Sequence, residues 1–289
     1  MTVAATMPKM LRAESLAAAP GIQLYTVGKE LTEDLAGTLA KVAAIGYKTV
    51  ESAGTAGKTA AEFRKALDAA GLKCVSSHMF SPTQTREQFF EDAKTLGAEY
   101  GVSSVIIKPT APIKSADDYI KLIGALTKDD YKKMAGELNT MGSQAKSAGL
   151  QFAYHNHNME FQKWSDGGTP YDTLMAETDP SLVKIELDCG WSDLGGRSPL
   201  EVFKQYPGRV RMLHIKDFAP VAHPVVTLDR NQVPEPTELG KGHIDYRPIL
   251  AAAPGAGVEH IFVEQEPPFT KFTVFEAAKV DYEYLRALA

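Results

Sequence analysis

The sequence predicts a single (β/α)8 TIM barrel, and three observations lead to that fold. From residue 22 onward, a short β-branched or apolar run is followed, again and again, by an amphipathic segment of ten or more residues. Eight such units occupy roughly 270 residues, which is the usual size of this barrel. The turn after the first run, YTVGKELTED, has one glycine. A doubly wound open sheet, the alternative fold, would carry a Gly-rich phosphate loop there.

The units follow one another without a repeat beyond strand and helix. The first helix places Leu35, Leu39 and Val42 on one face and ends at Gly46, and the second ends at Gly71. The predicted strands are residues 22–27, 48–53, 73–79, 103–109, 150–156, 183–190, 210–218 and 260–266. The other clear helices cover residues 86–97, 128–148, 246–253 and 274–288. A Pro-rich insertion at 219–241 is too long for a plain connection and is predicted to be an active-site loop.

Composition limits the classes of partner and compartment. The net charge of −5 and the lack of a basic block argue against a nucleic-acid surface. No apolar run reaches the roughly 18 residues of a membrane span. The two cysteines lie in separate apolar runs and are predicted to be buried thiols of a reducing, cytoplasmic compartment. Residues 1–21 are predicted to be a tail or the remnant of an export leader, which keeps a periplasmic location open, and 22–289 the catalytic barrel.

Ionisable side chains follow nearly every predicted strand. The chemistry of a barrel enzyme sits at the carboxyl ends of its strands, so these side chains are expected to meet at one mouth. They are Glu51, His78, Lys108, His155, His157, Glu160, Asp188, His214, Lys216, Glu264 and Glu266, with Gln23 and Tyr25 on the first strand. Singly, each has an ordinary structural role; Asp188, for example, can cap a helix. Together they need a compensating cation, which favours a divalent metal over a network of protein charges.

The motifs IQLYTV, VESAG, YHNHNMEF, ELDCGWSDLGG, LHIKDF, ELGKGHID and VEQE span residues 22 to 266. In that order they resemble the sugar phosphate isomerase/epimerase group of xylose-isomerase-like barrels, which includes inosose dehydratases and tagatose-type epimerases. The resemblance covers nearly the whole barrel but says little about the substrate. It implies one divalent ion, Mn, Mg, Zn or Co, held by a Glu, Asp, His, Glu set from strands five to eight.

Carried over residue by residue, that set gives Asp188, His214 and Glu264 as metal ligands. Strand five departs from the family, because this chain reads Tyr154-His155-Asn156 where many members read Leu-Glu-Asn. Either His155 coordinates the metal or Glu160 supplies the missing carboxylate, and the prediction is Glu160. An imidazole in that place would favour Zn, Co or Ni over Mg or Mn. Strand alternation points His155 and His157 to the same side.

The resemblance implies proton abstraction next to the carbonyl of a sugar or keto-sugar through an enediolate, as in an isomerase or epimerase. A dehydratase or other lyase acting on a keto-sugar or inosose begins with the same step. The predicted catalytic residues are Glu160 or His155 on one side, Glu264 on the other, and His78 and Lys216 as hydroxyl or proton donors. Glu51, His157, Trp191 and Gln23 are predicted to contact the substrate, with Trp191 equally suited to packing. The glycines of GKGHID offer a phosphate site, although no basic cluster supports it.

Two other classes stay open. A metal-dependent DNA-repair endonuclease occurs on related barrels, but it needs a basic rim that a chain of net charge −5 does not show. A sugar-binding barrel without catalysis is compatible with the altered strand five. The expected partner is a small sugar, with no nucleic acid or membrane, and self-association can occur in barrels of this kind.

Overall fold

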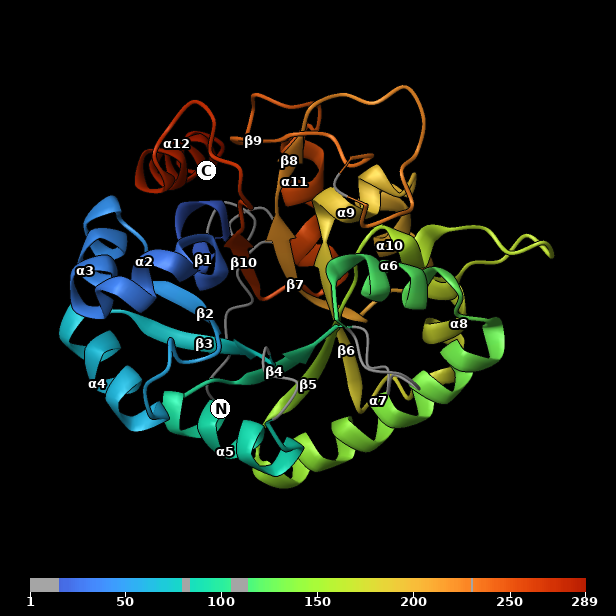
Figure 1. Ribbon diagram of the computed structural model, residues 1–289, viewed down its shortest axis with the longest axis horizontal. Coiled ribbons are helices and arrows are strands. Elements are labelled where there is room, and N and C mark those ends of the chain that lie inside the picture. The colour runs from blue at the N-terminus through green and yellow to red at the C-terminus, as the bar shows by residue number, and fades with distance from the viewer. Residues whose placement is uncertain (1–15, 80–83, 105–113, 230) are drawn as a thin grey trace, which may run out of the picture.

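Eight parallel strands close into one barrel in the computed structural model, which confirms the predicted (β/α)8 fold (Figure 1). The structure describes residues 16–79, 84–104, 114–229 and 231–289. Around the barrel the strands run in the order β1-β10-β7-β6-β5-β4-β3-β2, and β1 pairs with β2 to close it. The strands are β1 (Gly21–Gln23), β2 (Thr49–Ala53), β3 (Lys73–His78), β4 (Tyr100–Ser103), β5 (Gln151–His155), β6 (Val183–Asp188), β7 (Val210–Ile215) and β10 (His260–Val263).

Helices connect the strands and surround them (Figure 1). Four of them begin at a threonine whose hydroxyl and third-residue carboxylate form a capping box, which satisfies free N–H groups of the first turn. The helices are η1 (Leu24–Val27), α2 (Gly28–Glu33), α3 (Leu35–Ile45), α4 (Ala60–Ala70), α5 (Arg86–Leu96), α6 (Ala116–Gly124), α7 (Lys128–Ala148), η2 (Met159–Phe161), α8 (Pro170–Glu177), α9 (Cys189–Leu194), α10 (Pro199–Gln205), α11 (Tyr246–Ala256) and α12 (Val274–Ala287). Gly71 ends α4 at φ 71°, a left-handed conformation that favours glycine.

Most predicted strands run a few residues past the observed ends, and the first and the fourth differ more. The first is shorter than residues 22–27, because the side chain of Gln23 accepts a hydrogen bond from the backbone of Tyr25 (2.9 Å) and a 3₁₀ turn follows. The fourth lies at Tyr100–Ser103 instead of 103–109. Residues 105–109 of that prediction fall outside the described residues.

The barrel interior changes from apolar to polar along the strands. Tyr100, Val102, Ala153, Met212 and Phe262 form an apolar cluster near the strand beginnings. Nearer the carboxyl ends the inward positions are polar, and they are filled by Gln23, Glu51, Ser76, His78, His155, Glu186, Asp188 and His214, all buried. Burying so many polar groups costs free energy unless they bond to one another. This polar layer is therefore the part of the core that packing alone does not explain.

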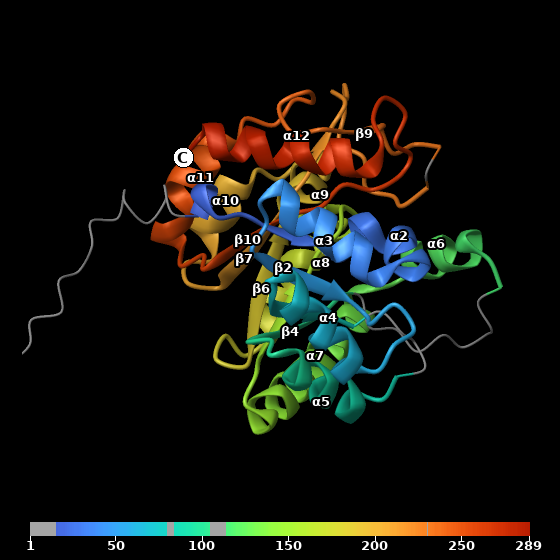
Figure 2. The ribbon, with the colours of Figure 1, turned by 90° about the vertical axis from the view of Figure 1, so that its left-hand side faces the viewer.

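The first described helices and the last helix of the chain lie side by side. Helix α12 lies beside α3, which closes the ring of helices (Figures 1 and 2). Of the predicted N-terminal tail, residues 1–15 lie outside the described residues, whereas Leu16 and Ala17 are buried in the main core.

Cys74 and Cys189 are buried and unbridged, as predicted. Within the described ranges, no helix has the length and apolar character needed to cross a membrane.

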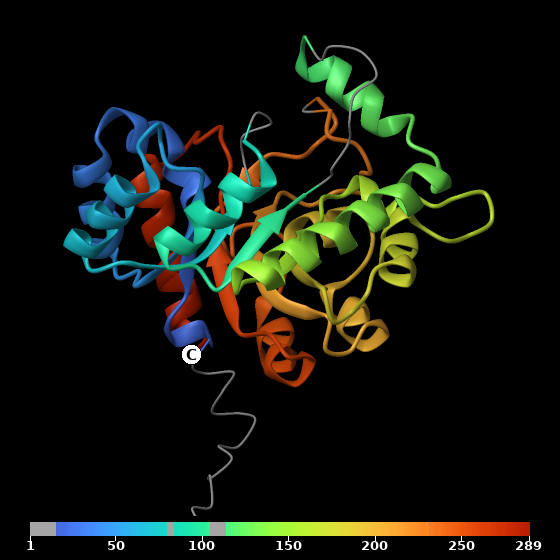
Figure 3. The same ribbon diagram turned by 90° about the horizontal axis from the view of Figure 1, so that it is seen from below.

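The insertion at 219–241 and helix α6 stand at the same end of the molecule. A short antiparallel pair, β8 (Asp217–Phe218) and β9 (Pro236–Thr237), holds the two ends of most of the insertion together. Helix α6 projects beyond the ring of helices (Figures 2 and 3). Both features rise above the carboxyl ends of the strands, where the polar layer opens.

Candidate active site

A polar cavity of about 270 Å³ opens at the carboxyl ends of the strands. Most of its lining consists of side chains that can bind a sugar hydroxyl, carry a proton or bear a charge. The lining residues are Tyr25, His78, Met79, Ser104, His155, His157, Glu264 and Glu266. The structure thus brings together His78, His155, His157 and Glu264, which the sequence analysis placed at one mouth.

Asp188 has two roles at the end of β6. Its Oδ1 accepts a hydrogen bond from the backbone of Trp191 (2.7 Å) and so caps α9. Its Oδ2 is buried without a hydrogen-bond partner. That oxygen lies 3.3 Å from Lys216 Nζ and 3.9 Å from His214 Nδ1. The structural role and the predicted role in a charged site therefore coexist in one side chain.

Lys216 is buried among three carboxylates. Its Nζ lies 2.7 Å from both Glu264 Oε2 and Glu266 Oε1, in addition to Asp188. Burial alone would lower the pKa of this ammonium, but the three negative charges outweigh burial and raise that pKa. The ammonium also lies 5.0 Å from the centre of the Trp191 ring, a cation–π contact. Lys216 is thus a permanent cation that balances the negative charges of Asp188, Glu264 and Glu266.

His214 links two groups of carboxylates through its two ring nitrogens. Its Nδ1 lies 3.1 Å from Glu264 Oε2, and its Nε2 lies 3.0 Å from Glu51 Oε1 and 3.2 Å from Glu186 Oε2. Burial opposes its positive charge, but Glu186 and Glu264 outweigh burial and raise the pKa of His214 well above its usual value. Without a bound metal the ring therefore carries a proton on each nitrogen.

The strand-five segment places His155 and His157 at the cavity and turns Asn156 toward β6. Asn156 accepts from the backbone N–H of Asp188 (3.1 Å) and donates to its carbonyl (3.3 Å), which fixes the two strand ends together. His155 Nδ1 lies 3.1 Å from Glu186 Oε2. Burial, with the charge of Lys216, lowers the pKa of His157 to about 4, so this imidazole is neutral near pH 7.

Glu160 does not join this group. Its carboxylate accepts hydrogen bonds from the Tyr154 hydroxyl (2.6 Å) and from the backbone of His157 (3.0 Å). Tyr154 precedes His155 and faces away from the barrel interior, and Glu160 in η2 follows it outward. Among the described residues, His155, Asp188 and His214 offer ligand atoms within 4.8 Å of one another, and no such set contains Glu160. The geometry therefore favours the alternative in which His155 is the strand-five ligand.

The sequence analysis missed Glu186. Glu186 is fully buried. It belongs to two groups of three side chains whose ligand atoms are close enough to hold a metal: one with His78 and His155, and one with Glu51 and His214. Its position two residues before Asp188 was the available signal, because alternate residues of a strand face the same side.

Three predicted substrate contacts lie below or behind the cavity. Gln23 and Ser76 donate hydrogen bonds to the carboxylate of Glu51, which has no exposed surface. Trp191 is 2% exposed and packs on Lys216 and on Phe218, with 4.9 Å between the two ring centres. In this structure Gln23, Glu51 and Trp191 shape the floor and wall of the site.

The glycine segment GKGHID is already filled by a carboxylate. Asp217 accepts hydrogen bonds from the backbone N–H groups of Gly240, Gly242, His243 and Ile244, at 3.0 to 3.3 Å. A phosphate would have to compete with this fixed negative charge. In this conformation these backbone N–H groups are therefore bonded to Asp217 and are not available to a phosphate.

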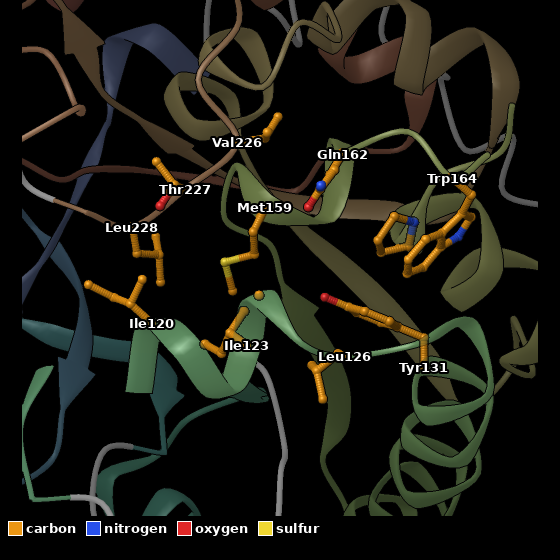
Figure 4. A pocket seen from close by; sticks show the side chains of 12 residues that line it. Ile120, Ile123, Leu126, Tyr131, Met159, Gln162, Trp164, Val226, Thr227 and Leu228 are labelled. Atoms are coloured by element: carbon orange, nitrogen blue, oxygen red, sulfur yellow. The ribbon is translucent and has the colours of Figure 1, made fainter. Parts of the chain in front are cut away.

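A second, apolar pocket of about 100 Å³ lies between α6, η2 and the insertion. Figure 4 shows Ile120 and Ile123 of α6 near Met159 and near Leu228 of the insertion. Tyr131, Trp164 and Gln162 line its other end. None of these side chains is a good proton carrier at neutral pH, so this pocket is not where the chemistry of the polar cavity takes place.

The barrel matches a known family. A model of the xylose isomerase-like TIM barrel family matches residues 39–287, and the chain belongs to that family. The chain is also similar to a structure described as a sugar phosphate isomerase/epimerase from Parabacteroides distasonis ATCC 8503. The TM-score is 0.74 and the identity 26%, over 92% of this chain and 97% of that one.

Relatives in several bacteria are named inosose dehydratase, and two of them show the range of similarity. The protein of Lacticaseibacillus casei is 31% identical over 172 residues, 56% of this chain and 55% of that protein. The chain thus spans little more than half the length of this relative. The protein of Geobacillus thermodenitrificans (strain NG80-2) is 26% identical over 266 residues, 86% of this chain and 87% of that protein.

Proposed function

We propose that the protein is a divalent-metal-dependent enzyme that removes a proton next to the carbonyl of a sugar or keto-sugar, as an isomerase or epimerase does. One observation carries the proposal: imidazoles, carboxylates and a buried ammonium converge on a single polar cavity at the carboxyl ends of the strands. The family and the sugar-related names of its relatives agree with this choice of substrate class.

The side chains fit a divalent ion. Among the described residues, Asp188 Oδ2 is buried without a hydrogen-bond partner, with Lys216 Nζ 3.3 Å away. The ligand atoms of His155 and His214 lie within 4.8 Å of an Asp188 oxygen. Glu264 stands beside His214 and would complete a set drawn from strands five to eight. Imidazole and carboxylate ligands suit Zn, Co or Mn, with Mg less favoured by two imidazoles. A bound ion would supply the positive charge that polarises a carbonyl.

The side chains of the protein would divide the remaining work. Burial alone would raise the pKa of Glu264, but Lys216 and His214 outweigh it and hold that pKa well below its usual range. Glu264 is therefore ionised, and because both partners contact Oε2, Oε1 is the atom that would receive a proton. His157 is neutral, and its buried Nδ1 has no hydrogen-bond partner among the described residues, which suits it to bind a substrate hydroxyl.

A dehydratase is the second candidate, favoured by the two relatives named inosose dehydratase. Dehydration starts with the same proton removal and then needs an acid for the departing hydroxyl. His78 lines the cavity and can approach that hydroxyl. Lys216 is less suited, because three carboxylates hold its proton and raise its pKa.

Product analysis tests both candidates. The metal-loaded protein is incubated with a panel of ketohexoses and inososes, and the products are identified by NMR and by ultraviolet absorption. An isomer or epimer supports the main proposal, whereas loss of water to a conjugated ketone supports the dehydratase. Glu264→Gln should lower either rate at least 100-fold, within the usual range for removing a catalytic base. No product from any substrate with either protein contradicts both candidates.

A further inference from the structure

Below the cavity, two buried carboxylates share one hydrogen-bond donor. Glu51 comes from β2 and Glu186 from β6, and both side chains have no exposed surface. Both approach Nε2 of His214, at 3.0 and 3.2 Å. One N–H group cannot donate fully to two acceptors. The other oxygen of Glu186, Oε1, is buried and has no hydrogen-bond partner in the part of the chain that the structure describes.

Within the described residues, this pair has no lysine or arginine beside it, unlike the three carboxylates around Lys216. Lys216 balances Asp188, Glu264 and Glu266. Within the described part of the chain, the ion pairs of Glu51 and Glu186 are all with histidines. Gln23 and Ser76 also donate to Glu51, but they are neutral. His214 is positively charged when no metal is bound, but it also contacts Glu264, so one imidazolium faces three buried carboxylates. Such an excess of buried negative charge is costly, so the pair must share a proton or bind a positive ion.

Two further imidazoles stand beside the pair. His78 Nδ1 lies 3.6 Å from Glu51 Oε1, and His155 Nδ1 lies 3.1 Å from Glu186 Oε2. The ring centres of His78 and His155 are 5.2 Å apart. Two sets therefore bring three ligand atoms within 4.8 Å of one another around Glu186, one with both of these histidines and one with Glu51 and His214. Nitrogen and carboxylate ligands in such a group suit Zn or Co.

We propose that Glu186, together with His78 and Glu51, forms a second divalent-cation site beside the set of strands five to eight, with His155 and His214 within reach of both sites. These three side chains come from β6, β3 and β2, and none of them belongs to the other set. His155 and His214 lie between the two sites, and His214 faces them through different nitrogens. The proposal goes beyond the proposed sugar chemistry and does not depend on it.

Metal stoichiometry tests the site directly. Metal-free protein is titrated with Zn²⁺ by calorimetry, and bound zinc is measured after dialysis. The wild type should bind two ions per chain, and Glu186→Gln and His78→Gln one each. Asp188→Asn, which changes only the other set, should keep one. Glu238→Gln serves as control, because that buried carboxylate lies elsewhere, bonded to Gln265 (3.2 Å), and it should bind two.

Circular dichroism and thermal melting check that each variant is folded. Gln is close in shape to a protonated Glu186, and if that variant does not fold, His78→Gln decides the question. A single wild-type ion that both variants lose and Asp188→Asn keeps also supports the site. A single ion that both variants keep and Asp188→Asn loses overturns the second site and leaves the proposed function intact. No bound zinc in the wild type overturns both the second site and the metal dependence of the proposed function.

Discussion

Replacing Glu160 by glutamine should change how the stability of the protein depends on pH. Burial raises the pKa of Glu160 from 4.5 to about 7, although the hydrogen bonds from Tyr154 and His157 favour its charged form. The folded protein therefore holds a proton on Glu160 more tightly than the unfolded chain does. That contribution to stability is fully present below pH 4.5 and is lost as the pH rises through 7.

The size of the effect follows from the two pKa values. Each pKa unit corresponds to about 1.4 kcal/mol, so a rise from 4.5 to about 7 is worth about 3 kcal/mol. Glutamine does not titrate and cannot show this loss. Relative to the wild type, Glu160→Gln should therefore gain about 3 kcal/mol in free energy of unfolding between pH 4 and pH 8. All other titrating groups cancel in the difference between the two proteins.

Urea unfolding followed by circular dichroism at several pH values measures this difference. Tyr154→Phe is the matched comparison, because the Tyr154 hydroxyl donates to Glu160 and lowers its pKa. Without that hydroxyl, the loss of stability should extend to higher pH. A difference between wild type and Glu160→Gln that stays constant from pH 4 to pH 8 would show that Glu160 is ionised normally in the folded protein. In that case, the account of its buried position fails.

Three further substitutions probe the site. Lys216→Met leaves three buried carboxylates without their ammonium and should lower the free energy of unfolding at pH 7 by about 3 to 5 kcal/mol. Urea unfolding should show a smaller loss of stability at pH 5. An equal loss at the two pH values would argue against a charge effect. Asp188→Asn keeps an oxygen to cap α9 but loses its charge, so calorimetry should show at least tenfold weaker metal binding with an unchanged melting temperature. Gly190→Ala should lower the free energy of unfolding by about 1 to 3 kcal/mol, because the new Cβ would lie 2.9 Å from the Lys216 carbonyl oxygen. Gly255→Ala is the control, because its new Cβ meets nothing within 4 Å, and this variant should melt like the wild type.

The fold was predictable because each strand and helix leaves a local pattern in the sequence. Apolar runs predicted most of the strands, and glycines marked where several helices end. The positions of Asp188, His214 and Glu264 at the ends of predicted strands placed them at the mouth of the barrel. Strand four was misplaced because the β-branched run at 105–107 looks more like a strand than Tyr100–Ser103 does. Local pattern marks where a strand is, but the exact ends depend on pairing with its neighbours.

The remaining features of the site depend on tertiary contacts. Glu186 was overlooked because only the closed barrel shows that it meets Glu51 from the opposite strand. Glu160 was placed in the metal site because sequence distance alone suggested that it could reach back. The turn after β5 instead brings the Glu160 side chain to Tyr154, outside the barrel. An irregular turn has no periodic pattern in the sequence, so the orientation of this side chain could not be predicted.

Exchange of the α-hydrogen of a keto-sugar with deuterated solvent tests the central claim most directly. The metal-loaded protein should remove that proton signal from the NMR spectrum of a substrate, whichever product follows. Treatment with a chelator should stop the exchange, and adding back Zn²⁺ or Mn²⁺ should restore it. A keto-sugar that binds, as seen by saturation transfer, but keeps its α-proton in the metal-loaded protein would contradict the account and identify a sugar-binding barrel without catalysis.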